Sequence, residues 1–383
     1  MRNPVGGRAP RHAAVRFGRG QWGVASVGVF ERMMRGGHEQ VVFCHDRTSG
    51  LRAIIAIHDT ALGPALGGCR MRPYATEEEA LEDALSLARA MTYKAAAAGQ
   101  NHGGGKVVIW GDPAADKSEA LFRALGRFIG TLRGRIITGT DAGTEPTDFL
   151  RARQESPWFV GLPEEEGGSG DTAALTAYGV WQGMRACARF LWGEASLRNR
   201  RVALQGLGKV GSRLLEHLVA DGAQVAVTDL RPERIEAARA AHPGVVGIDP
   251  EEIYAFPCDI FSPCALGGVL NDGTIPRLRC AAVAGSANNQ LAEPRHGDLL
   301  HERGILYAPD YVINAGGLIQ VADEILGFSP ERARRKVAAI YDRLLQIFAI
   351  SQEEQIPTHR AADRLAEERI AGRGRLRGLY IPE

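Results

Sequence analysis

The stretch from Arg201 to Asp229, RVALQGLGKVGSRLLEHLVADGAQVAVTD, decides the fold class of this chain. Residues 201–205 are a short β-prone run that leads directly into the pattern G-L-G-K-V-G at residues 206–211. A segment with helical character follows, and a second β-prone run ends at Asp229. This order predicts one βαβ unit of a doubly wound α/β sheet, because a strand, the G-x-G-x-x-G pattern, a helix, a second strand and an acid follow one another within about thirty residues.

This unit also predicts a ligand. Its glycines admit a pyrophosphate to the N-terminus of the helix that follows them. Asp229 would bind a ribose 2′-hydroxyl and repel a 2′-phosphate, which predicts NAD rather than NADP. The alternative is a glycine-rich turn that binds no ligand. The cofactor-binding residues predicted in this loop are Gly206, Gly208, Lys209, Val210 and Gly211.

Two lysines upstream, Lys94 and Lys106, stand on either side of an Ala-rich and then Gly-rich segment. A capping box at residues 76–79 precedes apolar residues at helical spacing, so Lys94 is expected near the end of a helix. The glycines at 103–105 let the backbone approach a neighbour closely. Lys106 opens the apolar run 107–110, a predicted buried strand, where lost hydration favours the neutral, basic form of a lysine. The alternative is a pair of surface lysines.

Length and composition limit the class of protein. The chain has 383 residues, enough for two domains, and is 45% hydrophobic and 24% charged. Its net charge of +1 gives no field that favours nucleic acid or an anionic membrane, and no run of about 18 apolar residues could span one. The six cysteines form no C-x-x-C, so we expect reduced thiols in a cytoplasmic protein without a metal site.

The remaining patterns alternate between strands and helices. Polar, glycine-containing loops follow β-prone runs at 285–289 and 314–317, where a doubly wound sheet binds its ligand; simple turn chemistry is the alternative. A long helix with an N-cap serine and an N1 proline is expected from Ser329, with an apolar stripe as far as Phe348. The other expected elements are strands at 41–44, 51–57 and 135–138, a backbone-exposing loop at 62–68, helices at 117–131, 176–191 and 358–370, and a loose end at 372–378.

Together these residues resemble the leucine/phenylalanine/valine dehydrogenase branch of the amino-acid dehydrogenase family, with the leucine dehydrogenases as the nearest group. The resemblance covers residues 38–372 and leaves the N-terminal segment outside. It is carried by five blocks, which are GPALGG at 63–68, MTYK at 91–94, GGGK at 103–106, GSANNQ at 285–290 and APDYVINAGG at 308–317.

The resemblance implies a role for each matching residue of the reaction centre. Lys94 is similar to the lysine that holds the substrate α-carboxylate. Lys106 is similar to the catalytic lysine, which activates the water that attacks the imino acid, and Asp141 to the acid that moves protons to and from the substrate nitrogen. A cation for the carboxylate and a base for the water suit the hydride transfer to the nicotinamide. The further cofactor-binding residues that the resemblance implies are Thr176, Ala265, Asn288 and Asn314.

Substrate selectivity is also implied by the resemblance. The related glutamate dehydrogenases place a lysine where this chain has Leu66, and a leucine cannot pair the charge of a dicarboxylate. Leucine dehydrogenases typically have an alanine and a glutamate where this chain has Gly139 and Thr140, so we expect a wider pocket. The substrate-binding residues implied, besides Lys94, are Leu66, Gly67, Gly68, Gly139, Val337 and Ile340.

The chain divides into four segments on this interpretation. Its first thirty residues contain five arginines and no acid, a composition that can imitate an organelle transit peptide. The modest apolar content and many glycines favour a disordered tail or an overlong predicted start instead. Residues 167–171, GGSGD, are the best linker candidate. The expected division is a basic, disordered tail at 1–36, a substrate-binding and catalytic domain at 37–171, a Rossmann NAD-binding domain at 172–327, and C-terminal helices at 328–383 that pack back on the first domain.

The sequence therefore predicts an α/β enzyme with a substrate domain, a doubly wound Rossmann domain and a cleft between them. Its expected reaction is the NAD-dependent, reversible oxidative deamination of apolar L-amino acids, leucine and also valine and isoleucine, to the 2-oxo acid, ammonia and NADH. Phenylalanine or tryptophan dehydrogenase activity is the alternative within the branch, and a non-catalytic NAD-binding regulatory protein is the alternative outside it. A homo-oligomer is expected, with neither nucleic acid nor membrane as a partner.

Overall fold

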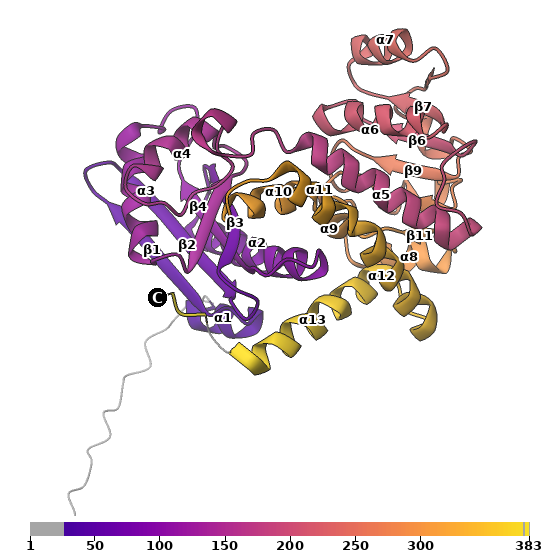
Figure 1. The fold of residues 1–383 in the computed structure, drawn as a ribbon. Coiled ribbons are helices and arrows are strands. Elements are labelled where there is room, and N and C mark those ends of the chain that lie inside the picture. The colour runs from indigo at the N-terminus through magenta and orange to yellow at the C-terminus, as the bar shows by residue number, and fades with distance from the viewer. Residues whose placement is uncertain (1–26, 378–379, 383) are drawn as a thin grey trace, which may run out of the picture.

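The structure is a computed structural model that describes residues 27–377 and 380–382. It contains two sheets, which lie on opposite sides of the molecule in Figure 1. Helix α13 (Thr358–Arg377) runs beneath them from the second part of the molecule to the first (Figure 1). The predicted α/β class with two domains is confirmed.

The first part is built on a five-stranded sheet with the order β1-β2-β4-β3-β5. Strand β3 runs parallel to β4 and β5, whereas β2 runs antiparallel to β1 and β4. The elements of this part are α1 (Val29–Gly36), β1 (Gln40–Asp46), β2 (Leu51–Asp59), β3 (Ala65–Arg72), α2 (Glu77–Ala97), β4 (Gly103–Trp110), α3 (Glu119–Thr131), β5 (Ile136–Thr140) and α4 (Pro146–Arg153).

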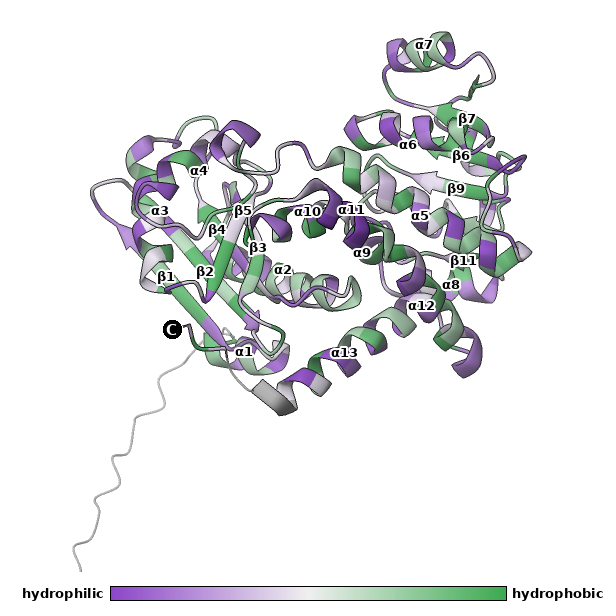
Figure 2. Ribbon diagram, in the orientation of Figure 1, coloured by the Kyte–Doolittle hydropathy of each residue, from purple (hydrophilic) through white to green (hydrophobic). Residues whose placement is uncertain are grey.

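Both faces of this sheet are covered. Helix α2 packs Leu81 and Leu85 on the face that carries Val108, and α3 and α4 cover the other face with Phe122 and Phe149. Each large apolar side chain buried in this way contributes about 1.5–3 kcal/mol. Figure 2 shows the corresponding concentration of hydrophobic residues in β2 and β4. Because alternate residues of a strand share a face, Lys106 lies on the same face as Val108.

Strand β3 corrects one expectation. The loop expected at 62–68 ends at Pro64, because β3 begins at Ala65. Its glycines allow close approach of the neighbouring strand, since a Cβ on Gly67 would lie 1.7 Å from the carbonyl oxygen of Gly105. The same holds for β4, where a Cβ on Gly104 would lie 2.2 Å from the backbone nitrogen of Thr92. The glycines are therefore strand residues, in spite of the weak strand propensity of glycine, because neighbouring backbones occupy the space of their side chains.

The second part is a six-stranded parallel sheet with the order β11-β10-β9-β6-β7-β8. The order reverses between β6 and β9, and such a switch point is where a doubly wound sheet binds its ligand. The elements of this part are α5 (Ala173–Trp192), β6 (Arg201–Gln205), α6 (Lys209–Ala220), β7 (Gln224–Thr228), α7 (Pro232–Ala241), β8 (Val246–Gly247), β9 (Ile260–Pro263), β10 (Ala282–Val283), α8 (Arg295–Glu302), β11 (Leu306–Tyr307), α9 (Asp310–Ile313) and α10 (Gly316–Glu324).

Two expected elements differ in this region. The run before Asn314 is the short helix α9 rather than a strand, and α10 starts two residues after Asn314. Val312 and Ile313 are fully buried in the helical core, so tertiary packing overrides their β propensity. The long helix expected from Ser329 is capped as predicted, but it is two helices, α11 (Pro330–Ala338) and α12 (Ile340–Glu354), which meet at Ala339.

The two ends of the described chain are more helical than expected. Residues 29–36, placed in the disordered tail, form α1, and Arg32 of this helix pairs with Glu82 of α2 at 3.0 Å. The tail expectation is therefore wrong for this stretch, and residues 1–26 lie outside the described residues. Helix α13 continues to Arg377, so the end expected to be loose from residue 372 is helical up to that point.

The C-terminal helices connect the two parts of the molecule. Helix α12 packs on α5, and α13 packs on α2. Arg369 of α13 donates to the carbonyl oxygens of Ala96 and Gly99, at 3.3 and 3.0 Å, where a cation complements the C-terminal end of α2. Helix α13 thus fixes the end of the helix that carries Lys94. None of the helices in the described part of the chain is long and apolar enough to cross a membrane.

Candidate active site

A cavity of about 430 Å³ lies between the first sheet and helices α9 and α10 of the second part. The predicted site residues that line it are Leu66, Gly67, Gly68, Lys94, Lys106, Gly139, Asp141 and Asn288. Arg70, Leu318 and Val321 are among the lining residues that were not predicted. Residues from β3, β4, β5 and α2 therefore meet residues of the second part around one space.

The lysine of β4 and the acid that follows β5 form an ion pair in this cavity. Lys106 is 5% exposed, and its Nζ donates to Oδ2 of Asp141. Burial raises the pKa of Asp141, but the nearby cations Lys106 and Arg70 outweigh it and lower the pKa overall. The expected burial of Lys106 is confirmed, although it lies inside the strand rather than at its start.

Gly68 makes room for this pair. A Cβ on Gly68 would lie 2.8 Å from Cβ of Asp141 and 3.3 Å from Nζ of Lys106. Any side chain at this position would push against the ion pair. Strand β3 must therefore pass the pair as bare backbone, which gives the glycine a role in the geometry of the site.

Lys94 lies in the last turn of α2 and reaches an amide of the second part. Its Nζ donates to Oδ1 of Asn314 at 2.7 Å, and Nδ2 of Asn314 donates to Oδ1 of Asn288 at 2.7 Å. Burial lowers the pKa of Lys94 to about 8, and the carboxyl of Asp310 opposes this shift. An amine in this position can bind a carboxylate within the cavity, and the two predicted asparagines lie beside it.

Arg70 and Asp83 are further charged residues next to the pair that the sequence patterns did not indicate. Arg70 Nε donates to Oδ2 of Asp141 at 3.2 Å, and its NH1 lies 3.2 Å from both carboxylate oxygens of Asp83. Asp83 on α2 also accepts a hydrogen bond of 2.6 Å from the Tyr74 hydroxyl. One feature of the sequence could have placed Arg70 at the site, because residues two apart in a strand share a face and Arg70 is two residues after Gly68 in β3.

An apolar wall closes one side of the cavity. Leu66, 2% exposed, packs with Ile137, Val160 and Ala322, and Leu318 and Val321 of α10 lie against the same cluster. Helix α10 is held there by Glu324, whose carboxylate accepts hydrogen bonds from Gly161 N at 2.8 Å and Ser169 N at 2.9 Å. Leu66 therefore presents a hydrocarbon surface to any side chain in the cavity.

Val337 and Ile340 do not belong to this wall. Both are fully buried in the core between the C-terminal helices and α5, where they contact Gly179. Their assignment to the substrate pocket is corrected by the structure. The residues of the second part that occupy the expected place are Leu318 and Val321. An apolar stripe along one helix could not distinguish a core-facing residue from a cavity-facing one, because both are apolar.

Gly139 lines the cavity, but it does not widen it. A Cβ on this residue would lie 2.8 Å from the carbonyl oxygen of Val160 and 3.3 Å from its Cγ2. The backbone of the neighbouring segment already fills the volume that the missing methyl group leaves. The expectation of a wider pocket at this position is therefore corrected.

The glycine loop of the second part has the shape that a pyrophosphate requires. Gly206 has a φ of +101°, which suits a tight turn, and a Cβ on Gly211 would lie 2.0 Å from the carbonyl oxygen of Gly206. A Cβ on Gly208 would meet nothing within 4 Å, so this glycine faces open space at the N-terminus of α6. Lys209 and Val210 form the first turn of that helix. These residues fit a dinucleotide.

Asp229 lies beside this loop and is already well bonded. Its Oδ2 accepts from Leu207 N at 2.7 Å, its Oδ1 accepts from Arg231 N at 2.9 Å, and Arg234 pairs with it at 3.3 Å. These contacts lower its pKa although burial raises it. The carboxylate is therefore held ionised at the end of β7, where a ribose would lie in a dinucleotide-binding sheet.

The remaining predicted cofactor residues lie at different distances from the loop. Ala265 is adjacent, because its Cβ would be 2.9 Å from a Cβ on Gly206. Thr176 lies on α5 and donates to the carbonyl oxygen of Thr172 at 2.9 Å, next to the start of α10. Asn288 lines the cavity, and Asn314 lies between Asn288 and Lys94, with a hydrogen bond of 2.7 Å to each.

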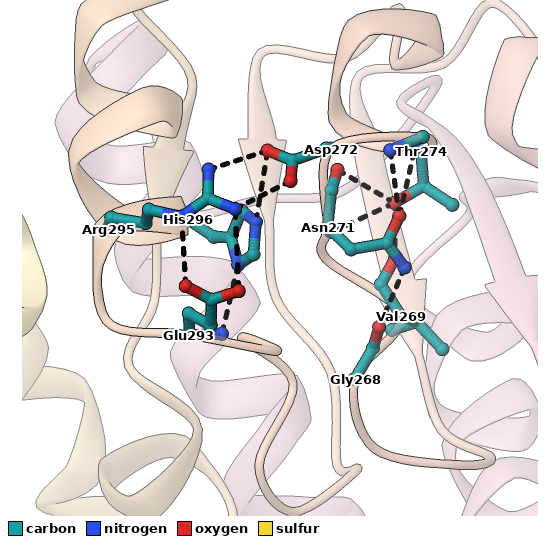
Figure 3. Close-up of polar contacts among 9 residues, drawn as sticks. Gly268, Val269, Asn271, Asp272, Thr274, Glu293, Arg295 and His296 are labelled. Atoms are coloured by element: carbon teal, nitrogen blue, oxygen red, sulfur yellow. Dashed lines mark hydrogen bonds and ion pairs between the residues drawn. The ribbon is translucent and has the colours of Figure 1, made fainter.

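Polar contacts connect Asp272 to the residues at the start of α8 (Figure 3). Arg295 binds both oxygens of Asp272, at 2.7 and 2.6 Å, and also Glu293 at 2.9 Å. His296, 1% exposed, accepts at Nδ1 from Glu293 N at 2.9 Å. These contacts tie Asp272 to residues 293–296, at the N-terminal end of α8.

Comparisons with known proteins agree with this geometry. A family model described as "Glu/Leu/Phe/Val dehydrogenase, dimerisation domain" matches residues 38–156, and one described as "Glutamate/Leucine/Phenylalanine/Valine dehydrogenase" matches residues 167–233 and 226–378. The chain belongs to the Glu/Leu/Phe/Val dehydrogenase family. The resemblance drawn from the five sequence blocks is thereby confirmed, and the chain is an oxidoreductase of the amino-acid dehydrogenase class.

Members of several branches of this family are similar to the chain. Leucine dehydrogenase of Geobacillus stearothermophilus is 55% identical over 92% of this chain and 96% of its own length. Phenylalanine dehydrogenase of Thermoactinomyces intermedius is 57% identical over 89% and 94%. The crystal structure of L-tryptophan dehydrogenase from Nostoc punctiforme superposes with a TM-score of 0.84 at 46% identity, covering 91% of this chain and all of that one. Family membership and the doubly wound sheet together imply a nicotinamide cofactor.

Proposed function

We propose that this chain catalyses the NAD-dependent, reversible oxidative deamination of apolar L-amino acids, with leucine as the main substrate and valine and isoleucine as others. One observation carries the proposal. A single cavity brings together Lys94, whose amine can bind a carboxylate, the Lys106–Asp141 pair and an apolar wall. The products are the 2-oxo acid, ammonia and NADH.

The side chains divide the chemistry between them. Lys94 binds the α-carboxylate and orients the substrate, with Asn314 as its neighbour. Asp141 exchanges protons with the substrate nitrogen, and Lys106 takes a proton from the water that adds to the imino carbon. When bound, the nicotinamide cofactor supplies the acceptor for the hydride of the α-carbon. Lys106 is 5% exposed, and its removal from bulk water strengthens its electrostatic interactions.

Selectivity for apolar side chains follows from the wall at Leu66. A carboxylate placed against this 2% exposed leucine and its neighbours Ile137 and Val160 would face a cluster of apolar side chains. Leaving a charge unpaired there costs several kcal/mol, so we infer that glutamate is a poor substrate. Aliphatic side chains lose water on entering and meet hydrocarbon.

The preference for NAD over NADP rests on Asp229. Its ionised carboxylate lies at the end of β7 and would repel a 2′-phosphate while accepting a hydrogen bond from a 2′-hydroxyl. We also infer a homo-oligomer that assembles through the first part of the chain, because residues 38–156 match a model described as a dimerisation domain.

An aromatic amino acid is the second candidate substrate. Two specific observations favour it, the 57% identity to a phenylalanine dehydrogenase and the superposition on a tryptophan dehydrogenase. Against it stands Leu66, which together with Leu318 and Val321 narrows the apolar side of the cavity. A non-catalytic role is disfavoured because Lys94, Lys106 and Asp141 all line one cavity.

Initial rates decide between these substrates. NADH formation is followed by absorbance with leucine, valine, isoleucine, phenylalanine, tryptophan and glutamate at equal concentrations. The proposal expects the branched aliphatic amino acids to have the highest kcat/KM. A tenfold preference for phenylalanine or tryptophan would replace it with the aromatic alternative, and glutamate as the best substrate would refute the argument from Leu66.

A further inference from the structure

Two cations hold Asp141, and both contact the same carboxylate oxygen. Lys106 Nζ and Arg70 Nε each donate to Oδ2, the latter at 3.2 Å. Within residues 27–377 and 380–382, no side chain donates a hydrogen bond to Oδ1, and the carboxylate also has a contact with the backbone N–H of Ala142. The Asp141 side chain is 27% exposed and lines the cavity. Oδ1 is therefore the oxygen that is available to a substrate.

A second carboxylate, that of Asp83, holds the Arg70 guanidinium in place. Its NH1 lies 3.2 Å from both oxygens of Asp83, and Asp83 also accepts from the Tyr74 hydroxyl at 2.6 Å. Asp83 stands on α2, whereas Asp141 follows β5, so Arg70 bridges two elements through two carboxylates. A guanidinium is planar and stays charged at every pH at which proteins are stable. Arg70 therefore supplies a permanent positive charge at Oδ2, in a fixed orientation.

Lys106 cannot supply such a constant charge. To act as a base it must alternate between ammonium and amine during each turnover. When it is an amine, its attraction for the carboxylate of Asp141 is lost. Only one other cation is in contact with Asp141 among the described residues, and that is Arg70.

We propose that Arg70 is a positioning residue that holds Oδ2 of Asp141 while Lys106 changes protonation state, so that Oδ1 exchanges the proton with the substrate nitrogen. This inference rests on the proposed function. In the exchange, an N–H bond of the substrate ammonium breaks, its electron pair stays on nitrogen, and an O–H bond forms at Oδ1. The reverse transfer returns the proton to nitrogen in the aminating direction.

The charges around Asp141 determine whether its pKa rises or falls when Arg70 is removed. Arg70 faces Asp141 from β3 and Lys106 from β4. The other titratable residues that line the cavity are Lys94 on α2 and Asp310 and Tyr311 on α9, and Asp83 of α2 contacts Arg70. A cation within 4–6 Å lowers the pKa of a carboxyl group by about 1–3 units. A group whose pKa is lowered is ionised above that pKa, so losing Arg70 makes Asp141 take up its proton at higher pH.

The test compares pH profiles of kcat/KM for leucine with Arg70→Gln, Arg70→Lys and the parent. In Arg70→Gln, the acidic limb should move up by about one pH unit or more, so that activity falls about tenfold more at low pH than at high pH. Arg70→Lys keeps the positive charge, so its acidic limb should lie close to that of the parent. The matched control is Arg52→Gln, an exposed cation of β2 that stacks on Trp110 at 4.6 Å, and its profile should equal that of the parent.

A second variant separates this role from a loss of stability. Arg70→Gln leaves Asp83, whose side chain is 19% exposed, without its cation, which destabilises the fold. The double variant Arg70→Gln/Asp83→Asn removes that unpaired charge, so its melting temperature should recover while the acidic limb stays displaced. If the limb returns to the position of the parent together with the melting temperature, Arg70 has a structural role only.

A measurement without substrate keeps the inference independent of the proposed function. Asp141 is titrated by ¹³C NMR of aspartate-labelled protein, and its resonance is assigned with Asp141→Asn. In Arg70→Gln the titration midpoint should be higher than in the parent. An unchanged midpoint overturns the inference even if leucine is a substrate. A raised midpoint in a protein that oxidises no amino acid would support the interaction of Arg70 with Asp141 and would refute the proposed function instead.

Discussion

Truncation of Leu66 to alanine should change substrate selectivity more than it changes stability. Leu66 is 2% exposed and joins Ile137, Val160 and Ala322 in the wall of a cavity of about 430 Å³. Removing its side chain withdraws contact from a substrate side chain, and we expect a loss equal to about one methylene of such contact, which is about 1–3 kcal/mol, or 10–200-fold. The kcat/KM for leucine should fall within that range, whereas phenylalanine gains room, so the phenylalanine-to-leucine ratio should rise at least about tenfold.

The stability cost is also set by the surroundings of Leu66. Truncation of a fully buried leucine costs about 2–5 kcal/mol, depending on how far the site can collapse. Leu66 borders a cavity that is already open, so we expect a value at the lower end. The matched control is Leu344→Ala, because Leu344 is 0% exposed but lies in the core around α12, outside the cavity.

Two measurements on both variants test this prediction. Denaturant unfolding gives the free energy of unfolding, and NADH absorbance gives kcat/KM for leucine and phenylalanine. Leu344→Ala should lose stability and keep the ratio of the parent, whereas Leu66→Ala should change the ratio. Equal ratios in Leu66→Ala and the parent would show that the wall at Leu66 does not contact the substrate side chain.

Three further predictions concern the charged groups of the two sites. Lys106→Ala should lower kcat by at least about 10²-fold, because a base and its electrostatic help are removed, while titration of NADH fluorescence still shows binding; a rate within a few-fold of the parent contradicts the assignment. Asp229→Ser should narrow the gap in kcat/KM between NAD and NADP, and a parent that prefers NADP would show that the carboxylate has been misread. Lys94, with a pKa of about 8, is charged below that pH and loses its proton above it, so a 2-oxo acid should bind less well as the pH rises through 8. Calorimetric affinities should show this dependence in the parent and not in Lys94→Met.

Local patterns determined the nucleotide-binding half of this protein. The glycine spacing, the flanking β-prone runs and Asp229 lie within one short stretch, and each has its role through its immediate neighbours. Gly206 adopts its turn, Gly211 packs on Gly206, and Gly208 faces open space, as a dinucleotide-binding loop requires. The helix capped at Thr76 was predictable for the same reason, because the Thr76 hydroxyl accepts from Glu79 N, only three residues away.

The identity of the reacting pair was also predictable, but only through resemblance to a family. Lys106 and Asp141 are thirty-five residues apart in the chain, and no periodicity links them. Their contact exists because β4 and β5 both flank β3 in one sheet. The sequence motif marks the lysine, and the fold brings the carboxylate to it.

Tertiary structure alone decided the features that depend on contacts between distant segments. Strand β3 was hidden because its glycines have weak strand propensity, and only the backbones of neighbouring elements give them a place. The pocket residues of the second part are Leu318 and Val321 rather than Val337 and Ile340. An apolar pattern indicates that a residue is buried, but it does not show whether the residue faces the core or the cavity. Arg70 acquires its role from two carboxylates on other elements, and no local pattern in the sequence records such an arrangement.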